Sequence, residues 1–345
     1  MRKSLVFVSL STSLVFISLF LWFAFSLDNA TIRIGAFLLT FVLINTITTE
    51  LSNSALQIEG RYLFLSIWQL MQSSLILILA LGSLTFFKRT FNEIEIGIFY
   101  FLSAVIFSST ATFIIYRFLQ RQNQQILSQN IVLKASNLPS TLQILKETAP
   151  FGVAGLFYLI YYQLGTVFVR YFEGAEATSY YTIAFNFLSV AIIVPGVIYQ
   201  KFLLPKLHRW AYHDREKFIL SYKYGNYAML GLGILGFMAL CFLAPYFIYW
   251  FFGEKYIPAI PIVKIMAINI PIVYVASSAG SLLVTQDHMK TKVYYMGFSA
   301  LISLIFNPIL IYNYGVFGAV YTNILSNLII LLLYINAVKK RILND

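Results

Sequence analysis

The sequence predicts an all-α, polytopic membrane protein with about ten spanning helices arranged in two lobes. Of its 345 residues, 59% are hydrophobic and only 11% are charged, whereas a soluble domain carries about 25% charged residues because its surface is solvated. The apolar segments run for ~20 residues without alternation, as spanning helices require, while barrel strands alternate over ~10 residues. This composition excludes a soluble enzyme, a secreted disulfide scaffold and a disordered protein.

Four apolar segments occupy the N-terminal part of the chain. A hydropathy window of ~19 residues places them at Ser4–Leu27, Thr31–Glu50, Leu63–Phe87 and Ile94–Tyr116. The first segment follows a basic start, as in a secretory signal, but it continues to about Leu27 without a small-residue cleavage site. We therefore interpret it as a retained span, and residues 1–117 as an N-terminal lobe of four helices.

A polar, amphipathic stretch separates this lobe from the rest of the chain. Between Arg117 and Thr148, aliphatic residues alternate with Gln, Ser, Asn and Lys, a pattern typical of a helix lying on the inner leaflet. Pro139 is expected to interrupt that helix. Residues 118–149 are therefore predicted to form a cytoplasmic linker between the two lobes.

Six further apolar segments form the predicted C-terminal lobe, residues 150–345. They are Pro150–Arg170, Tyr180–Leu203, Tyr222–Phe251, Pro258–Val284, Val293–Tyr312 and Val316–Val338. The third segment is long, and Pro245 is expected to break it so that its end lies in the membrane interface. The fourth contains three prolines, a density that predicts a bent helix of the kind that moves in transporters.

We interpret the net charge of +11 as a consequence of basic residues in cytoplasmic loops. With the N-terminus in the cytoplasm, 18 of the 24 Lys and Arg residues fall in cytoplasmic segments. Basic residues collect on that side of a membrane, so the asymmetry supports ten spans and two cytoplasmic termini. The one cysteine, Cys241, can form no intramolecular disulfide.

Short motifs follow one another in order through the C-terminal lobe. They are Pro150-Phe151-Gly152, Gly165 to Phe172, Glu176 to Tyr181, Pro205-Lys206-Leu207, Phe252 to Tyr256, Asn307-Pro308 and Tyr314 to Ala319. In order and spacing, this run resembles the C-terminal half of the polysaccharide (O-antigen repeat-unit) flippases of the MATE-like multidrug/oligosaccharidyl-lipid/polysaccharide exporter superfamily. The resemblance covers Pro150 to Arg341, and the N-terminal part adds its hydropathy and the motif Gln57 to Arg61.

The resemblance implies a MATE-like fold whose N-terminal lobe is incomplete, lacking the first two helices of the family. It implies a multi-pass protein of the bacterial inner membrane that moves a polyprenyl-pyrophosphate-linked oligosaccharide, an O-antigen or exopolysaccharide repeat unit, to the outer leaflet by alternating access. The implied partners are this lipid-linked substrate, membrane lipids and the polysaccharide polymerase or chain-length machinery, with no nucleic acid. Many relatives carry an acidic residue near Gly165; this chain has none there, so no ion-coupling role is carried over to that position.

The acidic residues argue against a second class of transporter. All 13 are predicted to lie in loops or at the ends of spans, with Glu50 closing the second span. A proton- or sodium-coupled exporter of cationic drugs requires a carboxylate at membrane depth. A MATE-type small-molecule antiporter is therefore the disfavoured alternative to the flippase, beside an inactive, truncated member of the family.

No motif in the sequence predicts an enzyme. The chain has no nucleophile elbow, phosphate loop, cysteine pair or metal-ligand spacing, and its three histidines fall in predicted cytoplasmic loops. A polysaccharide polymerase or acyltransferase would require a catalytic His or an Arg-rich outer loop, and the predicted outer loops are short. We therefore predict no catalytic residue, no cofactor and no metal site.

Cations at membrane depth are the candidate binding groups for an anionic substrate. Lys264 lies about six residues, or ~9 Å, into its predicted span, where a cation requires water or an anion. Its alternative role is a side chain that reaches back to the outer interface. Arg170 and Arg33 lie closer to that interface, where the alternative is anchoring.

Two further arginines and two amides complete the predicted site. Arg117 and Arg61 fall near the inner face, where topology alone favours basic residues, although they are also placed to line the mouth of an inward-open cavity. Gln163 and Asn186 are polar residues within spans. Such residues commonly join helices, so a direct contact with substrate is the second interpretation for both.

Overall fold

The computed structural model describes residue 18 and residues 30–87, 93–128, 141–284 and 288–343. Every regular element in these ranges is helical, and eight of the helices found there are long and apolar enough to cross a membrane. The chain is therefore a multi-pass helical membrane protein, as the sequence predicts. The predicted first span, Ser4–Leu27, lies outside the described residues apart from Ser18.

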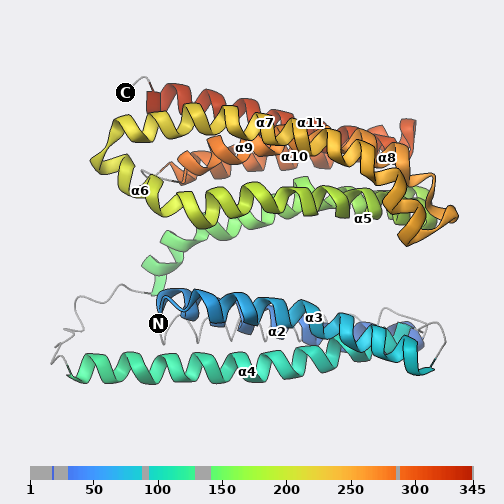
Figure 1. Cartoon of the computed structure of the whole chain (residues 1–345), viewed down its shortest axis with the longest axis horizontal. Coiled ribbons are helices and arrows are strands. Elements are labelled where there is room, and N and C mark those ends of the chain that lie inside the picture. The colour runs from blue at the N-terminus through green and yellow to red at the C-terminus, as the bar shows by residue number, and fades with distance from the viewer. Residues whose placement is uncertain (1–17, 19–29, 88–92, 129–140, 285–287, 344–345) are drawn as a thin grey trace. The chain divides into compact units, whose positions relative to one another are not determined.

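The chain divides into two compact units, Met1–Thr141 and Leu142–Asp345. In the first unit, α2 (Ala30–Ile58) packs along α4 (Glu93–Ser128), and α3 (Tyr62–Phe87) contacts both helices (Figure 1). Its small core includes Trp68 and Phe107, whose rings meet edge to face with centroids 5.1 Å apart. Helix α4 passes the predicted end of its span at Tyr116, because no Gly or Pro occurs before Ser128 to stop it.

The position of Glu50 differs from the prediction. Helix α2 continues to Ile58 and ends before Gly60, whose φ is 70°, so Glu50 lies eight residues, or ~12 Å, inside the helix. The prediction that it closes a span is therefore wrong. The polar run around it lowers the hydropathy without ending the helix, because hydroxyl groups bond to carbonyls one turn back, as Thr49 does to Asn45 at 2.7 Å.

Helix α5 (Thr141–Pro195) contains the predicted span Pro150–Arg170 and most of the predicted span Tyr180–Leu203, which ends in the following η2 (Gly196–Leu203). Its backbone leaves the helical conformation at Gly174, with φ 84° and ψ −169°, a region that only glycine enters without strain. The two halves fold back on each other, since the rings of Tyr162 and Phe185 have centroids 4.8 Å apart. One glycine thus converts a 55-residue helix into a helical hairpin.

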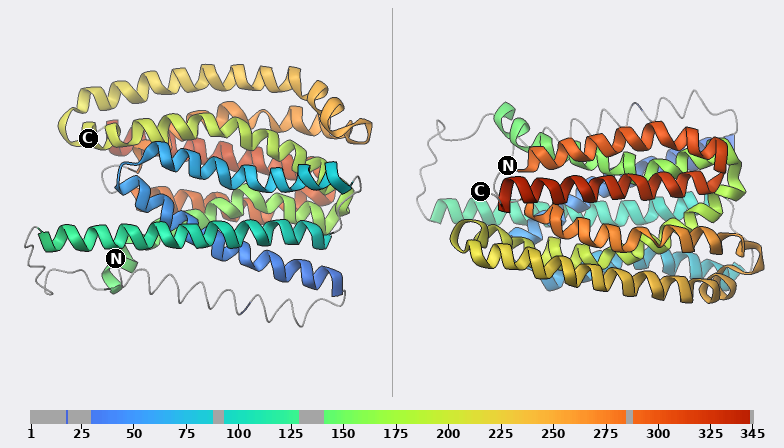
Figure 2. Two further views of the ribbon diagram at one scale, coloured as in Figure 1. Left: turned by 60° about the horizontal axis from the view of Figure 1, so that its bottom comes forward. Right: turned by 90° about the horizontal axis from the view of Figure 1, so that it is seen from above.

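The rest of the second unit is a bundle of long helices (Figure 1). Its elements after α5 are η2 (Gly196–Leu203), α6 (Leu204–His213), α7 (Arg215–Phe247), η3 (Ile248–Phe252), η4 (Glu254–Tyr256), α8 (Ala259–Met266), α9 (Asn269–Leu282), α10 (Met289–Tyr314), α11 (Val316–Val338) and η5 (Lys339–Leu343). Helices α10 and α11 lie side by side (Figure 2), joined by Gly315 with φ 57°. The larger of the two core clusters lies entirely in this unit.

A charged cap begins α7 outside the membrane-spanning part. The carboxylate of Asp214 accepts hydrogen bonds from the backbone N–H of Lys217 at 3.1 Å and from its ammonium group at 2.6 Å. The side-chain bond, followed by the backbone bond, holds the pKa of Asp214 below its usual value. The cap therefore stabilises the folded state above the unfolded-state pKa and is lost as the pH falls through the lower folded-state value.

Pro245 does not break its helix, contrary to the prediction. Helix α7 runs through Pro245 to Phe247, and the π-helical segment η3 follows it directly. Proline removes one backbone donor, but a local π turn offers new partners to the freed carbonyls, and the N–H of Ile248 bonds to both Ala244 and Pro245. The helical path ends instead at Gly253, with φ 82°.

The predicted bend in the Pro258–Val284 segment is present. The helix stops after Met266 and resumes at Asn269. Pro271 has no N–H, and the Ala267 carbonyl accepts from Ile270 at 2.9 Å. Two short helices, α8 and α9, thus replace one straight span.

A chain of buried amides holds the bundle together. The Asn327 side chain donates to the Oδ1 atom of Asn269 on α9 at 2.9 Å and to that of Asn323 at 3.1 Å. Asn323 in turn donates to the backbone carbonyl of Tyr162 on α5 at 3.3 Å. Polar side chains in a membrane protein commonly join helices in this way, and here three amides in sequence connect α5, α9 and α11.

These hydrogen bonds between amides predict the effect of an Asn327→Leu substitution. The change removes both donated bonds and leaves Asn269 and Asn323 with unpaired buried oxygens, so we expect a loss of about 1–2 kcal/mol in stability. Asn336→Leu, at an exposed position of the same helix, is the matched control and is expected to change little. Unfolding of both purified variants by titration with denaturing detergent measures the difference in stability. Equal stability of the two variants would contradict the structural role of the amide hydrogen bonds.

Candidate functional site

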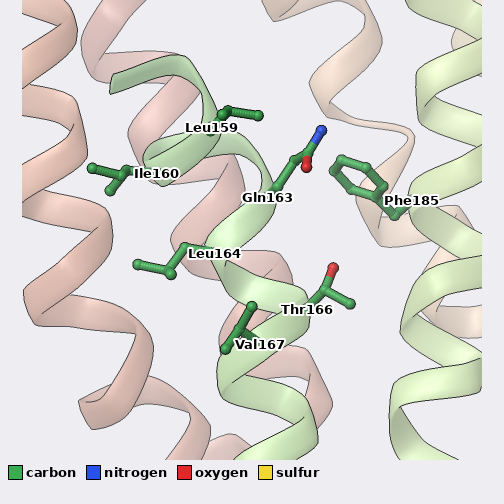
Figure 3. A pocket seen from close by; sticks show the side chains of 7 residues that line it. All are labelled: Leu159, Ile160, Gln163, Leu164, Thr166, Val167 and Phe185. Atoms are coloured by element: carbon green, nitrogen blue, oxygen red, sulfur yellow. The ribbon is translucent and has the colours of Figure 1, made fainter. Parts of the chain in front are cut away.

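Three cavities in the second unit bear on function. Two lie along the hairpin of α5, and a third, larger one lies among α5, α9, α10 and α11. The first has a volume of about 510 Å³, and Figure 3 shows the amide of Gln163 directed across it toward the ring of Phe185. The two side chains come from opposite halves of α5, so the break at Gly174 creates this cavity.

The second cavity, of about 480 Å³, lies closer to the break in α5. Its lining residues are Arg170, Ala175, Thr178, Ser179, Thr182, Ile183, Asn186, Phe252 and Tyr256. Arg170 is the only charged side chain among them. Hydroxyl and amide groups surround this cation, and two aromatic rings close one side.

Helical spacing places the polar residues of both cavities on one surface, which we call the α5 face. On the first half of α5, Gln163, Thr166 and Arg170 follow at intervals of three and four residues. On the second half, Thr178, Thr182 and Asn186 follow at intervals of four. The structure thus brings together three of the predicted site residues, Gln163, Arg170 and Asn186.

Two carboxylates flank the break at Gly174 without lining either cavity. Glu176 accepts a hydrogen bond from the Tyr180 hydroxyl at 2.6 Å. The carboxylate oxygens of Glu173 face Gly315, 3.6 Å from the position of a β-carbon there. The α5 face therefore keeps the cationic character that Arg170 gives it.

The third cavity, of about 740 Å³, contains one charged residue, Lys292. The sequence places this lysine at the cytoplasmic edge of a span that begins at Val293, whereas the structure includes it in the first turns of α10. Its ammonium lies 6.0 Å from the ring centroid of Tyr334. Two charged residues line the three cavities, Arg170 and Lys292, and both are cations.

Lys264 lies apart from these cavities. It is an exposed residue of α8, and its backbone carbonyl accepts a weak bond from the Cys241 thiol with Sγ and oxygen 3.9 Å apart. It lines none of the three cavities. Its role in substrate binding stays a prediction.

The arginines of the first unit occupy different surroundings. Arg61 forms an ion pair with Glu59 at 3.2 Å, and Arg121 contacts the same carboxylate at 3.1 Å. Arg117 lies over the ring of Phe113, 5.1 Å from its centroid. Arg33 is exposed near the start of α2. Arg61, Arg117 and Arg33 therefore belong to a different unit from Arg170, and Arg61 forms an ion pair.

Sequence reasoning missed several polar residues of the cavities, namely Thr166, Thr178, Ser179, Thr182, Ser277, Ser281, Asn327 and Lys292. The threonines share helix faces with Gln163, Arg170 and Asn186, so their spacing was the available signal. Lys292 carried no such signal, because the opposing wall comes from distant segments of the chain. In the described part of the protein, no cluster of three His, Cys, Asp or Glu residues is placed to hold a metal.

Comparison with known proteins shows the fold. No family model matches the chain, and no curated protein matches it by sequence. The structure is similar to an outward-facing multidrug resistance MATE family transporter of the MOP superfamily, with a TM-score of 0.65, 15% identity, and coverage of 99% of this chain and 77% of that one. A crystal structure of a MATE point mutant gives a TM-score of 0.63 at 14% identity over the same shares. The chain therefore has a MATE-like fold.

The geometry of the α5 face predicts its accessibility to water. In a Cys241→Ala background, cysteines introduced at Gln163 and Asn186 are expected to react with a water-soluble maleimide in membranes, because both positions line cavities on the polar α5 face. A cysteine at Leu235, an exposed apolar position on α7, is expected to react at least about tenfold more slowly, because thiolates do not form in lipid. Equal labelling at the three positions would show that the α5 face is not an aqueous surface.

Proposed function

We propose that the protein is a flippase for a polyprenyl-pyrophosphate-linked oligosaccharide. The observation that carries the proposal is the charge of the cavities, since Arg170 and Lys292 are their charged lining residues and both are cations. Cations that line a cavity favour an anionic occupant. The MATE-like fold and the sequence motifs of the C-terminal lobe support the assignment.

The α5 face offers groups for each part of such a headgroup. Arg170 is the partner for a phosphate, which guanidinium binds through two parallel bonds. The hydroxyls of Thr178 and Thr182 and the amides of Gln163 and Asn186 suit sugar hydroxyls. The lipid chain would remain in the bilayer while the two units rock and expose the headgroup on the other side.

The proposal includes the location and the partners. The protein would lie in the bacterial inner membrane with both termini in the cytoplasm and act beside the polysaccharide polymerase or chain-length machinery. A membrane potential that is negative inside assists outward movement of an anion by ~2.3 kcal/mol per charge per 100 mV. The membrane potential therefore favours outward movement of an anionic substrate.

Complementation of a bacterial strain that lacks its own repeat-unit flippase tests this function. We expect the natural chain to restore surface polysaccharide, Arg170→Lys to retain part of the activity because it keeps the charge but loses the two-bond geometry, and Arg170→Glu to reduce it at least about tenfold, because a carboxylate repels the phosphate. Lys264→Glu is a second arm and is expected to weaken activity. Surface polysaccharide is measured by gel and antibody staining.

Lys255→Glu is the matched control for charge alone. Lys255 is an exposed residue of η4 near the second cavity, but it does not line that cavity. Membrane expression of every variant is measured by immunoblot. If Arg170→Glu and Lys255→Glu lose activity equally, the α5 face is not the binding surface; if well-expressed natural chain restores nothing with several repeat-unit types, the flippase proposal fails.

Glu50 favours a second candidate, a MATE-type antiporter of small cations. It is an exposed carboxylate about two turns inside α2, and ionisable groups at such depth commonly bind a coupling ion or a cationic substrate. One of the structurally similar proteins is a multidrug resistance transporter. The two candidates thus place their key charges on different units.

Dye transport in proteoliposomes tests the second candidate. An antiporter would move a cationic dye against an imposed pH or sodium gradient, and Glu50→Gln would abolish that movement because the amide cannot carry a charge. Glu50→Asp is the matched control and would retain part of the rate. Absence of gradient-driven dye movement by the natural chain, or unchanged movement by Glu50→Gln, would exclude this mechanism.

A further inference from the structure

We propose that the third cavity, enclosed by α5, α9, α10 and α11, is a binding site for a phosphate group carried on a lipid chain, with Lys292 as its cation. This site is separate from the α5 face, and the inference does not rest on the proposed function. The chemistry that it would recognise is a headgroup of net negative charge, a phosphate ester or diphosphate without a compensating cation, attached to an apolar tail. An anionic phospholipid and a polyprenyl diphosphate both present this chemistry.

The first argument is an uncompensated charge. Lys292 is partly buried in the wall of the cavity, and the described residues provide no ion pair or hydrogen bond to its ammonium. None of the lining residues is acidic. An ammonium held in a low-dielectric wall is costly unless an anion or water accompanies it, so the cavity favours an anionic occupant.

The second argument is the supply of hydrogen-bond donors. Three tyrosines line the cavity, Tyr158, Tyr161 and Tyr334, and the described residues offer no hydrogen-bond partner to their hydroxyls. Ser277 and Ser281 already donate to backbone carbonyls at 2.8 Å and 2.7 Å. The free donors are thus one ammonium and three phenols, a set that fits the oxygens of a phosphate.

The third argument is the close approach of Lys292 and Tyr334 at Gly280. A β-carbon on Gly280 would lie 2.8 Å from Cε2 of Tyr334 and 3.7 Å from Nζ of Lys292. Because glycine has no side chain, both groups occupy this space and point into one cavity. The cation therefore lies at a defined point of the wall.

The remaining wall suits an apolar tail. Phe151, Met289, Met296 and Ile330 line the cavity, and its volume of about 740 Å³ lies in the range of sites for small molecules. Phe151 is 57% exposed, which places an opening beside it. A ligand with a charged head and an apolar tail matches this division better than a free sugar or a metal ion.

The position of the cavity agrees with a lipid ligand. Lys292 is in the first turns of α10, and Tyr334 is in the last turns of α11, so the cavity lies at the end of the unit that the distribution of basic residues predicts to be cytoplasmic. Leu204, the first residue of α6, also lines it. Inner leaflets carry anionic headgroups that basic pockets between helices bind.

Native mass spectrometry of the purified full chain in a neutral detergent measures lipid binding and tests the inference. The probes are phosphatidylglycerol, a polyprenyl diphosphate, inorganic phosphate and zwitterionic phosphatidylcholine. We expect Lys292→Met to lower the affinity for the preferred phosphate lipid at least about tenfold and Lys292→Arg to keep it within about threefold. Lys290→Met, an exposed lysine two residues away, is the matched control and should change the affinity less than about twofold.

The probes separate the sources of the phosphate. Tighter binding of polyprenyl diphosphate assigns the cavity to a lipid-linked substrate, tighter binding of phosphatidylglycerol assigns it to membrane lipid, and either result supports the inference. Binding of inorganic phosphate alone would overturn the requirement for a tail. Equal losses in Lys290→Met and Lys292→Met, equal binding of phosphatidylcholine, or binding of no probe would overturn the site.

Tyr334→Phe keeps the test decisive if Lys292→Met does not fold. This change removes one hydroxyl from the cavity and retains the ring beside Lys292, so we expect a loss of affinity of about threefold or more with unchanged monodispersity. Tyr294→Phe, on an exposed tyrosine of α10 outside the cavity, is its control. Unchanged affinity in both Tyr334→Phe and Lys292→Gln would contradict the inference.

Discussion

The amide of Asn327 is the interaction on which the C-terminal unit depends. It binds Asn269 and, through Asn323, the backbone of the first half of α5, so it fixes the register of three helices. Apolar side chains cannot set register in a bilayer, because lipid tails are as apolar as the helices they surround. The same amide lines the third cavity; the network that aligns the helices therefore also shapes the space between them.

The α5 face depends on a second local constraint, the backbone of Gly174. A residue with a side chain would be strained at φ 84° and ψ −169°, and without the turn the two halves of α5 would not oppose each other. The hairpin brings Arg170 to the same cavity as Asn186. A single backbone conformation thus assembles a cationic, hydroxyl-rich surface from residues that are far apart along an extended helix.

Charge divides the possible functions between the two units. The cavities of the second unit present Arg170 and Lys292, which suits anionic headgroups. The first unit presents Glu50 inside α2, which suits a cation. A flippase with one acidic helix and an antiporter with cationic cavities would share the same MATE-like fold, because a fold by itself does not specify which cargo its side chains bind.

The sequence by itself determined the class of protein, a multi-pass helical membrane protein, because burial in lipid requires long apolar runs that composition reveals directly. It also made Arg170, Gln163 and Asn186 candidate site residues, because polar side chains are conspicuous inside such runs. Only the tertiary structure decided which polar residues meet. The prediction placed Glu50 at the end of a span, whereas hydroxyl-to-backbone bonds keep the polar run around it helical. Lys292 lies beside Tyr334 and Gly280. These residues are distant in sequence, so the local pattern around Lys292 could not reveal the cavity. Hydropathy reports local burial, whereas a binding site is a property of contacts between distant segments.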